Sequence, residues 1–427
     1  MNDLLIIEDH VLKGVRKKEI TSATIPEGVT TIGEKAFFEC ALLKSVTIPD
    51  SVTTIEDKAF YDCSALTAVN LPNSLTKLGT SAFAFCTSLL SVTIPSGVKK
   101  IGHGAFINCS SLHSVTFSKG LSIIGGSAFE DCMALVSVVI PEGMVKIGEC
   151  AFSNCSSLPS VNIPDSLAII SNCAFSWCKG LQTIHVGSNN SRYLSIDGIL
   201  YSKDNSCILK YPAGRQDSQF VIPDCVTTIG ENAFENCGNL ESIIIPDSVT
   251  EIGISAFFNC TSLLSITIPD RVSEIRDEVF LSCSSLRSVM IPEGVTLIGS
   301  NAFCGCSALE SVSIPDSVKE IGDFAFQYCS SLKSATISDG VRIIGKSAFA
   351  DCVSLLSANI PDDVTVISMC TFAGCTSLQS VRLPDGLTTI GKSAFEQCTS
   401  LESLSIPDGV TEIEEDAFRN CAYQPEC

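Results

Sequence analysis

Two stretches of the chain match the phosphate-loop pattern G-x-x-x-x-G-K-[ST], in which backbone N–H groups and a lysine hold nucleotide phosphates. They are GVRIIGKS at residues 340–347 and GLTTIGKS at residues 386–393. The pattern works only as an exposed glycine-rich turn between a buried strand and a full helix. Whether these stretches bind nucleotide therefore depends on the elements around them.

Cysteine offers a second kind of chemistry, because 23 of the 427 residues are cysteines. Sixteen recur at one position of a sequence repeat, where a small apolar thiol suits a core. The others are Cys150, Cys173, Cys207, Cys225, Cys304, Cys370 and Cys427. Cys150 and Cys173 lie 23 residues apart and are the best candidates for a disulfide. Cys304 and Cys306 lack the second pair that a zinc site needs, so we expect reduced thiols, no metal and no cofactor.

Carboxylates form a third group, because Asp or Glu occupies one repeat position in nine consecutive repeats. The first five are Asp224, Asp247, Asp270, Glu293 and Asp316. We expect an acidic ridge along one rim of the molecule. It is either a solvated rim whose carboxylates cap turns, or a site where cations or a basic partner relieve like-charge repulsion.

Histidine gives no support for catalysis. The four histidines are His10, His103, His113 and His185. None lies in H-E-x-x-H or beside a Ser or Cys nucleophile in a recognised motif. We predict no catalytic residue.

The overall charge excludes two classes of partner. The formal net charge is −20 and the isoelectric point is near 4.6, so the chain repels nucleic acid and anionic lipid. The N-terminal MNDLLIIEDHVLKGV carries acids where a signal peptide needs a basic and then an apolar region. We expect no nucleic-acid binding, no membrane insertion, and either a cytoplasmic location or export by a route that the sequence does not show.

A 23-residue repeat organises the chain and indicates a solenoid, in which each repeat forms one coil. Its unit is L-x-S-V-x-I-P-D-x-V-x-x-I-G-x-x-A-F-x-x-C-x-x. The segment L-x-x-V-x-I alternates as a strand does and proline ends it, while A-F-x-x-C suits one helical or 3₁₀ turn. Phenylalanine keeps its position in all 16 repeats, from Phe37 to Phe418, and we expect these rings to form the core.

The repeat accounts for the two phosphate-loop matches. Gly340 and Gly386 occupy a position where glycine recurs in other repeats, while Ile344 and Ile390 occupy core positions. Only one turn of helix can follow each match. We predict that neither stretch binds nucleotide, which leaves a nucleotide-binding or hydrolytic enzyme as the less favoured alternative.

The pairing of L-x-x-V-x-I-P with I-G-x-x-A-F-x-x-C at a 23-residue step closely resembles the BspA-like leucine-rich repeat family, over roughly residues 20–421. The resemblance implies a curved, right-handed leucine-rich repeat solenoid. Its parallel β-sheet would lie on the concave face, with short helical or 3₁₀ turns on the convex face. Many bacterial members are cell-surface or secreted proteins that bind host or neighbouring-cell proteins, so the resemblance also implies an adhesin.

The repeat is interrupted once, where Pro164 and Pro223 lie 59 residues apart. The runs ILYS and CILKY flank the turn-rich spacer KDNS, which predicts an inserted β-hairpin. We divide the chain into an N-terminal capping segment (1–19), leucine-rich repeats (20–186), a hairpin island (187–222), and further repeats with a short C-terminal tail (223–427). The island carries Tyr193, Tyr201 and Tyr211, which either form a binding face or pack on their own coil.

The solvent-facing strand position, two residues before the proline, is mostly small and hydroxylated. One cluster differs: Val221, Ile244 and Met290, with Thr267 between them. Exposed apolar patches mark interaction sites, although β-branched residues also suit strands. We expect a non-enzymatic scaffold that binds an unidentified protein through the concave sheet and the island, with a cell-surface adhesin as the alternative. The last strand lacks a polar cap, which leaves end-to-end self-association open.

Overall fold

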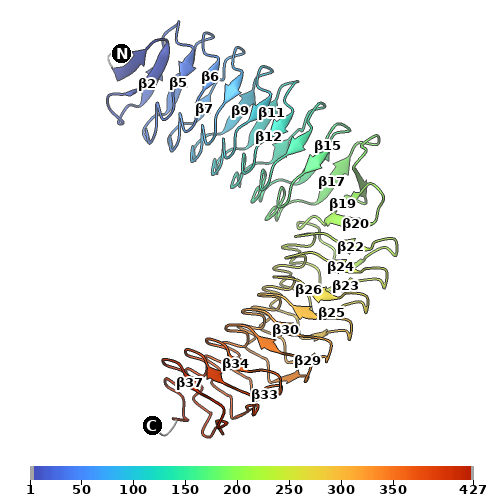
Figure 1. The fold of residues 1–427 in the computed structure, drawn as a ribbon. Helices are drawn as coiled ribbons and strands as arrows, with labels where there is room; N and C mark the ends of the chain where they lie inside the picture. Colours follow the sequence, from blue (N-terminus) through green and yellow to red (C-terminus); the bar gives the residue numbers. More distant parts are fainter. Residues whose placement is uncertain (1–3, 425–427) are drawn as a thin grey trace. The chain divides into compact units, whose positions relative to one another are not determined.

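The computed structural model describes residues 4–424, and every regular element among them is a β-strand. The chain forms two compact units, each with its own core (Figure 1). Unit 1 comprises residues 1–203 and 212–215, and unit 2 comprises residues 204–211 and 216–427. Each unit is a parallel β-solenoid, which confirms the predicted repeat fold.

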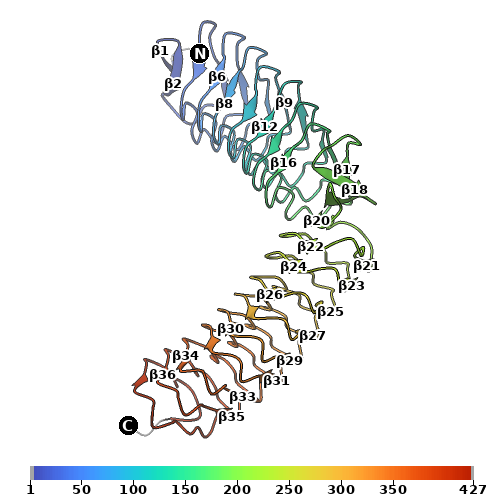
Figure 2. The ribbon, with the colours of Figure 1, turned by 45° about the vertical axis from the view of Figure 1, so that its right-hand side comes forward.

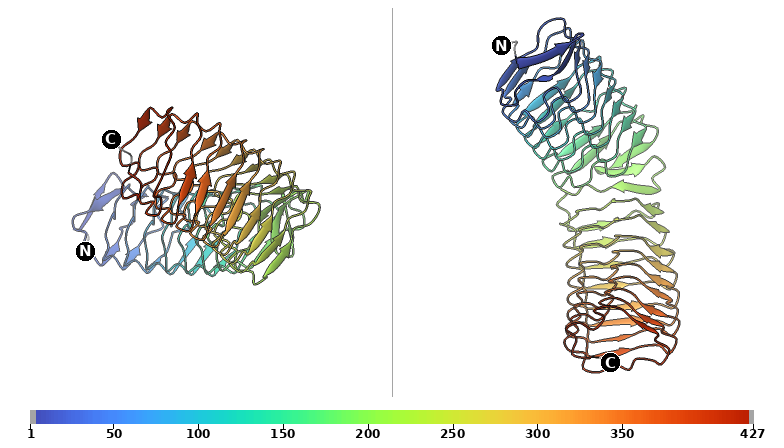
Figure 3. Two further views of the ribbon diagram at one scale, coloured as in Figure 1. Left: turned by 90° about the horizontal axis from the view of Figure 1, so that it is seen from below. Right: turned by 60° about the vertical axis from the view of Figure 1, so that its left-hand side comes forward.

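Each coil contributes two strands to two different sheets. One strand, of two to four residues, lies in the S-V-x-I segment, as predicted, and we call it the long strand. The other, usually of two residues, ends just before the glycine of V-x-x-I-G, and we call it the short strand. Figure 2 shows the two sets of strands along opposite sides of unit 2, and Figure 3 shows them stacked as successive rungs. The short strands escaped prediction because two residues are too few to show an alternating pattern.

In unit 1 the short strands are β2 Val11–Val15, β4 Thr31–Ile32, β6 Thr54–Ile55, β8 Lys77–Leu78, β10 Lys100–Ile101, β12 Ile123–Ile124, β14 Lys146–Ile147 and β16 Ile169–Ile170. The long strands are β3 Ser22–Thr24, β5 Ser45–Thr47, β7 Ala68–Val69, β9 Ser91–Ile94, β11 Ser114–Phe117, β13 Ser137–Val138, β15 Ser160–Ile163 and β17 Thr183–Val186. Neighbouring coils pair in parallel at equivalent repeat positions, as Val92 does with Val115.

In unit 2 the short strands are β20 Cys207–Lys210, β22 Thr228–Ile229, β24 Glu251–Ile252, β26 Glu274–Ile275, β28 Leu297–Ile298, β30 Glu320–Ile321, β32 Ile343–Ile344, β34 Val366–Ile367, β36 Thr389–Ile390 and β37 Glu412–Ile413. The long strands are β21 Gln219–Val221, β23 Ser242–Ile244, β25 Ser265–Thr267, β27 Ser288–Met290, β29 Ser311–Ile314, β31 Ser334–Ile337, β33 Ser357–Asn359 and β35 Ser380–Arg382. Their pairing is parallel and keeps the repeat register.

Two antiparallel hairpins interrupt the parallel pattern of unit 1. The first joins β1 (Leu5–Glu8) to β2, and β2 then pairs in parallel with β4, so it begins the short-strand sheet. The second joins β18 (Tyr193–Ile196) to β19 (Ile199–Ser202). The strands predicted at ILYS and CILK are present as β19 and β20, and β18 is an additional strand before them. Asp197 and Gly198 form its turn with positive φ values of 52° and 78°, as a tight hairpin requires.

The A-F-x-x-C segment is not a helix, which corrects the predicted helical turns. In the first full coil Lys35 and Glu39 both have φ of 58°, and two left-handed residues so close together prevent a right-handed helix. The amides of Lys35, Phe37 and Glu39 donate to carbonyls of the next coil, at 2.7 to 3.1 Å. The residues between them close turns within the coil. The segment therefore alternates between amides that bond to the next coil and amides that close turns within its own coil.

The phenylalanines form one continuous stack inside each unit, as the repeat predicts. Neighbouring rings lie 4.8 to 5.8 Å apart between centroids and are nearly parallel. All 16 are buried. In unit 2 the stack begins with Tyr211, whose ring centroid lies 5.2 Å from that of Phe234. These offset stacks add aromatic contact to the burial of apolar area.

Candidate interaction surface

The long strands of unit 2 present an apolar patch to solvent. Val221, Ile244 and Met290 are 62%, 58% and 72% exposed. Val221 pairs with Ile244 across β21 and β23, and Thr267 pairs with Met290 across β25 and β27. The strand position before each of them is buried in β23, β25 and β27 and half-buried in β21, so the alternation holds these side chains outward.

Leu264 belongs to the same patch and was missed from the sequence. It is 42% exposed and lies directly before β25, the strand that carries Thr267. The sequence comparison covered only the position two residues before the proline, which is Thr267 in this coil. Leu264 lies three residues before Thr267 and was therefore not compared. Glu241 and Arg287 occupy the equivalent position in the neighbouring coils and are exposed. We call Val221, Ile244, Leu264 and Met290 the long-strand patch.

The island tyrosines pack inside their units and do not lie on this patch. Tyr201 and Tyr211 are each 1% exposed. The hydroxyl of Tyr211 donates to Asp217 at 2.6 Å. Tyr193 is half-buried, and its hydroxyl accepts the Ile170 amide at 2.9 Å. Their positions match the interpretation in which the island packs on its own coil.

The residues of the acidic ridge are exposed along unit 2: Asp224, Asp247, Asp270, Glu293 and Asp316. They lie one to a coil, so their carboxylates do not converge. Across residues 4–424, no group of three or more His, Cys, Asp or Glu side chains is arranged to hold a metal ion.

The phosphate-loop matches are ordinary coils whose amides are already used. The backbone N–H of Lys346 donates to Oδ1 of Asp323 at 2.7 Å, and that of Lys392 donates to Oε2 of Glu414 at 2.8 Å. A phosphate loop would direct these donors at an anion. Ile344, inside the first match, is 1% exposed. A carboxylate from the adjacent coil therefore occupies the place that a phosphate would take.

The repeated cysteines are buried thiols. Burial raises the pKa of Cys40 to about 11 and raises those of Cys86 and Cys109 further. Cys150 and Cys173 are both thiols in the structure, and burial raises the pKa of Cys150 to about 12. Cys427 lies outside the described residues. The raised pKa values keep Cys40, Cys86, Cys109 and Cys150 protonated near neutral pH, which suits packing and not nucleophilic chemistry.

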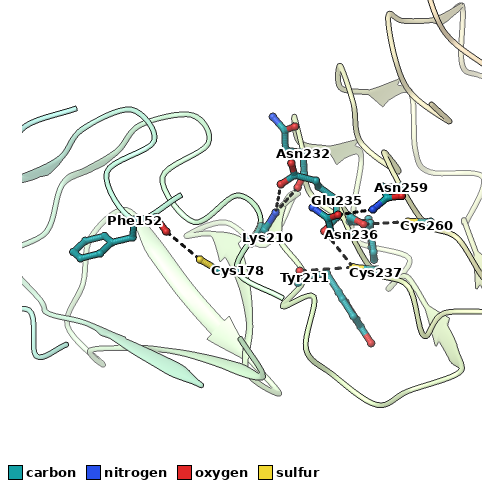
Figure 4. Close-up of polar contacts among 11 residues, drawn as sticks. Phe152, Cys178, Lys210, Tyr211, Asn232, Glu235, Asn236, Cys237, Asn259 and Cys260 are labelled. Carbon is teal, nitrogen blue, oxygen red and sulfur yellow. Dashed lines mark hydrogen bonds and ion pairs between the residues drawn. The ribbon is translucent and has the colours of Figure 1, made fainter. Parts of the chain in front are cut away.

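A buried ion pair closes the first coil of unit 2, and sequence analysis missed it. Lys210 Nζ lies 3.2 Å from Glu235 Oε2 and donates to the Asn232 carbonyl at 2.8 Å (Figure 4). The side chains are only 10% and 4% exposed. Nearby, the side-chain amide of Asn259 donates to that of Asn236 at 2.7 Å. Lys210 lies inside the apolar run CILKY, and this position could have predicted a buried charge that needs a partner.

Charge divides sharply between the two units. Unit 1 has 16 Lys and Arg against 17 Asp and Glu, a formal net charge of −1. Unit 2 has 11 against 30, a formal net charge of −19. Nearly all the acidity of the chain thus belongs to unit 2. No helix within the described part of the chain is long and apolar enough to cross a membrane.

Comparison with solved structures finds bacterial repeat proteins. A leucine-rich cell-surface protein of Faecalibacterium prausnitzii is 37% identical, with 75% of this chain and 79% of that chain covered and a TM-score of 0.59. A leucine-rich repeat protein of Bacteroides ovatus is 28% identical, covering 84% and 92%, with a TM-score of 0.55. The pneumococcal vaccine antigen PcpA, at 21% identity over 83% and 85% and a TM-score of 0.55, shows the fold alone. Comparison with curated proteins gave no match.

A family model agrees with these structures. The model of the BspA type leucine-rich repeat region (6 copies) matches residues 7–136, 122–197, 215–312 and 296–424. These ranges cover most of the chain and follow the 23-residue coils of both units. The chain belongs to the BspA-type leucine-rich repeat family.

Proposed function

We propose that this protein is a non-enzymatic scaffold that binds a protein partner through the long-strand patch. The observation that carries the proposal is the outward exposure of Val221, Ile244 and Met290 on the long strands β21, β23 and β27 of unit 2, at a repeat position that is mostly small and hydroxylated elsewhere. A rigid sheet that holds large apolar side chains in water favours a partner that covers them. The patch sits on a regular, closely bonded scaffold, so little order is lost on binding.

Site-specific photo-crosslinking tests this function. A photoreactive phenylalanine analogue replaces Met290, or Thr336 on the same face as the matched control, and the full-length protein is mixed with extract of the source cells. We expect one discrete adduct at 290 that disappears in an Ile244→Glu background, and none at 336. Equal adducts at both positions would contradict the proposal, and so would an adduct at 290 that persists in the Ile244→Glu background.

A second candidate is a cell-surface adhesin, favoured by the similarity to the cell-surface protein of Faecalibacterium prausnitzii. Under this proposal the same patch contacts a host or matrix protein. Brief protease treatment of intact source cells distinguishes the two. Peptides of this chain that are released without lysis support the adhesin. Peptides that are recovered only after lysis contradict the adhesin and support an intracellular scaffold.

A further inference from the structure

The short-strand sheets of the two units carry matching series of side chains, which are exposed except for the half-buried Ile123 and Leu297. In unit 1 the first residues of five successive short strands, β8 to β16, are Lys77, Lys100, Ile123, Lys146 and Ile169. In unit 2 the first residues of five successive short strands, β24 to β32, are Glu251, Glu274, Leu297, Glu320 and Ile343. Both series read charge, charge, apolar, charge, apolar, and the charges have opposite sign.

Strand pairing gives the last four members of the two series the same spacing, while Glu251 lies on β24, in a different sheet from β26. In unit 1 Lys100 pairs with Ile123, which pairs with Lys146, which pairs with Ile169. In unit 2 Glu274 pairs with Leu297, which pairs with Glu320, which pairs with Ile343. Parallel strands lie about 4.8 Å apart, so each series extends about 19 Å. Every member of one series can therefore face a member of the other.

The surface of unit 1 is hollowed at this series. A cavity of about 750 Å³ is lined by Lys100, Ile123, Gly125, Lys146 and Ile169, among others. Glycine beside the lysines leaves room for incoming side chains. Ile169 is 46% exposed, and its counterpart in unit 2, Ile343, is 53% exposed. Each face thus offers apolar area that a partner would cover.

The charged members are available for new pairing. Lys100, Lys146 and Glu320 are exposed and form no ion pair with another described residue. Arg276 lies 2.9 Å from Glu251 and 3.9 Å from Glu274, and Lys77 lies 3.1 Å from Glu56, in surface pairs. Exposed ion pairs of this kind contribute little stability, so they do not prevent exchange for a new partner.

We propose that the protein self-associates, with the short-strand face of unit 1 in one copy packing on the short-strand face of unit 2 in a second copy. Lys77 then faces Glu251, Ile123 faces Leu297 and Ile169 faces Ile343. The net charges of −1 and −19 favour this pairing over contact between two copies of unit 2. The interface joins unlike surfaces, so it continues into longer oligomers or closes into a ring. It is small, which makes it a weak, salt-sensitive association.

Sedimentation velocity on the full-length protein tests the self-association. At low salt we expect the weight-average sedimentation coefficient to rise with protein concentration, and at high salt to return to the monomer value. A variant with Lys100→Glu and Lys146→Glu should associate at least about tenfold more weakly, and so should one with Glu274→Lys and Glu320→Lys. The control, Lys44→Glu with Lys119→Glu, makes the same charge change at exposed lysines outside the series and should associate as the wild type does.

Mixing the two charge-reversed variants gives the decisive result. Each variant alone repels itself, but the reversed unit 1 of one complements the reversed unit 2 of the other, so the mixture should associate as the wild type does. Circular dichroism confirms that each variant is folded. A wild type that stays monomeric at low salt, or a mixture that stays monomeric, would overturn the proposal. Ile244→Glu, on the long-strand patch, should leave self-association unchanged, so this test is independent of the proposed function.

Discussion

The thiol of Cys260 donates a hydrogen bond to the carbonyl oxygen of Phe234, one coil earlier, with 3.1 Å between Sγ and O. The same carbonyl accepts the backbone N–H of Cys237 at 3.1 Å. Equivalent thiol bonds of 3.1 to 3.3 Å recur along both units, as in Cys63 to the Phe37 carbonyl. A carbonyl oxygen has two lone pairs and can accept two hydrogen bonds. The cysteine side chain therefore donates the second hydrogen bond to this carbonyl, in addition to filling the core.

Thiol reactivity should follow this arrangement. Among residues 4–424 we expect iodoacetamide at pH 8 to modify Cys225 first, because its side chain is exposed. Burial raises the pKa of Cys40 to about 11, so only about one thiol in a thousand is ionised at that pH. Raising the pH toward 11 should therefore increase labelling of Cys40. Peptide mass spectrometry measures each rate, and Cys225→Ser should remove the fast phase. Equal rates at Cys225 and the core cysteines would contradict this picture.

The phenylalanine stack should dominate the stability of unit 2. Phe257→Ala leaves a cavity between two stacked rings, and we expect a loss of about 3–5 kcal/mol in the free energy of unfolding. Phe258→Ala is the matched control, because this neighbouring ring is only half-buried and should cost less. Urea unfolding followed by circular dichroism measures both. A loss near zero at Phe257 would mean that the ring does not support its neighbouring coils.

The buried ion pair of the first coil of unit 2 should be more costly to break than to replace. Lys210→Met removes the cation that lies beside the buried Glu235 carboxylate, and we expect a loss of about 3–5 kcal/mol in the free energy of unfolding. Lys210→Met combined with Glu235→Leu removes both charges and should recover most of that loss. Thermal unfolding of the three proteins measures the coupling. A double variant as unstable as the single one would show that the charges themselves are not the cause.

The phosphate-loop matches should behave as structural turns. Asp323→Ala removes the acceptor of the Lys346 amide, and we expect it to lower the free energy of unfolding by about 1–2 kcal/mol. Lys346→Ala changes an exposed side chain and should stay within about 0.5 kcal/mol. Calorimetric titration with ATP and magnesium should give no binding heat. Saturable heat that Lys346→Ala removes would restore the nucleotide hypothesis.

Sequence alone was sufficient for features that repeat in every coil. The alternation of S-V-x-I gave the long strands, and the invariant spacing of Phe37 and its equivalents gave the core. The turn at A-F-x-x-C could not be assigned, because the φ of Lys35 and Glu39 depends on hydrogen bonds to the next coil and not on local preference. For the same reason sequence pattern favoured a helix where the structure has none.

Features that occur once were harder to predict. Lys210 and Glu235 lie 25 residues apart in the sequence, and no recurring position of the repeat predicts their contact. Tyr211 lies 23 residues before Phe234, so its place in the stack was available from spacing but was hidden by the island. The long-strand patch was found only in part, because Leu264 lies outside the strand position that was compared.

The bonds between coils also make length an adjustable property of this protein. Most neighbouring coils inside a unit meet through the same ring stack, the same amide–carbonyl offset and the same thiol bond. We therefore expect that a whole 23-residue segment can be removed from the middle of a unit and that the cut ends still match. Natural variation or design can thus change how far a surface extends in steps of about 4.8 Å. The number of coils therefore sets the length of the solenoid, while the cross-section of each coil stays the same.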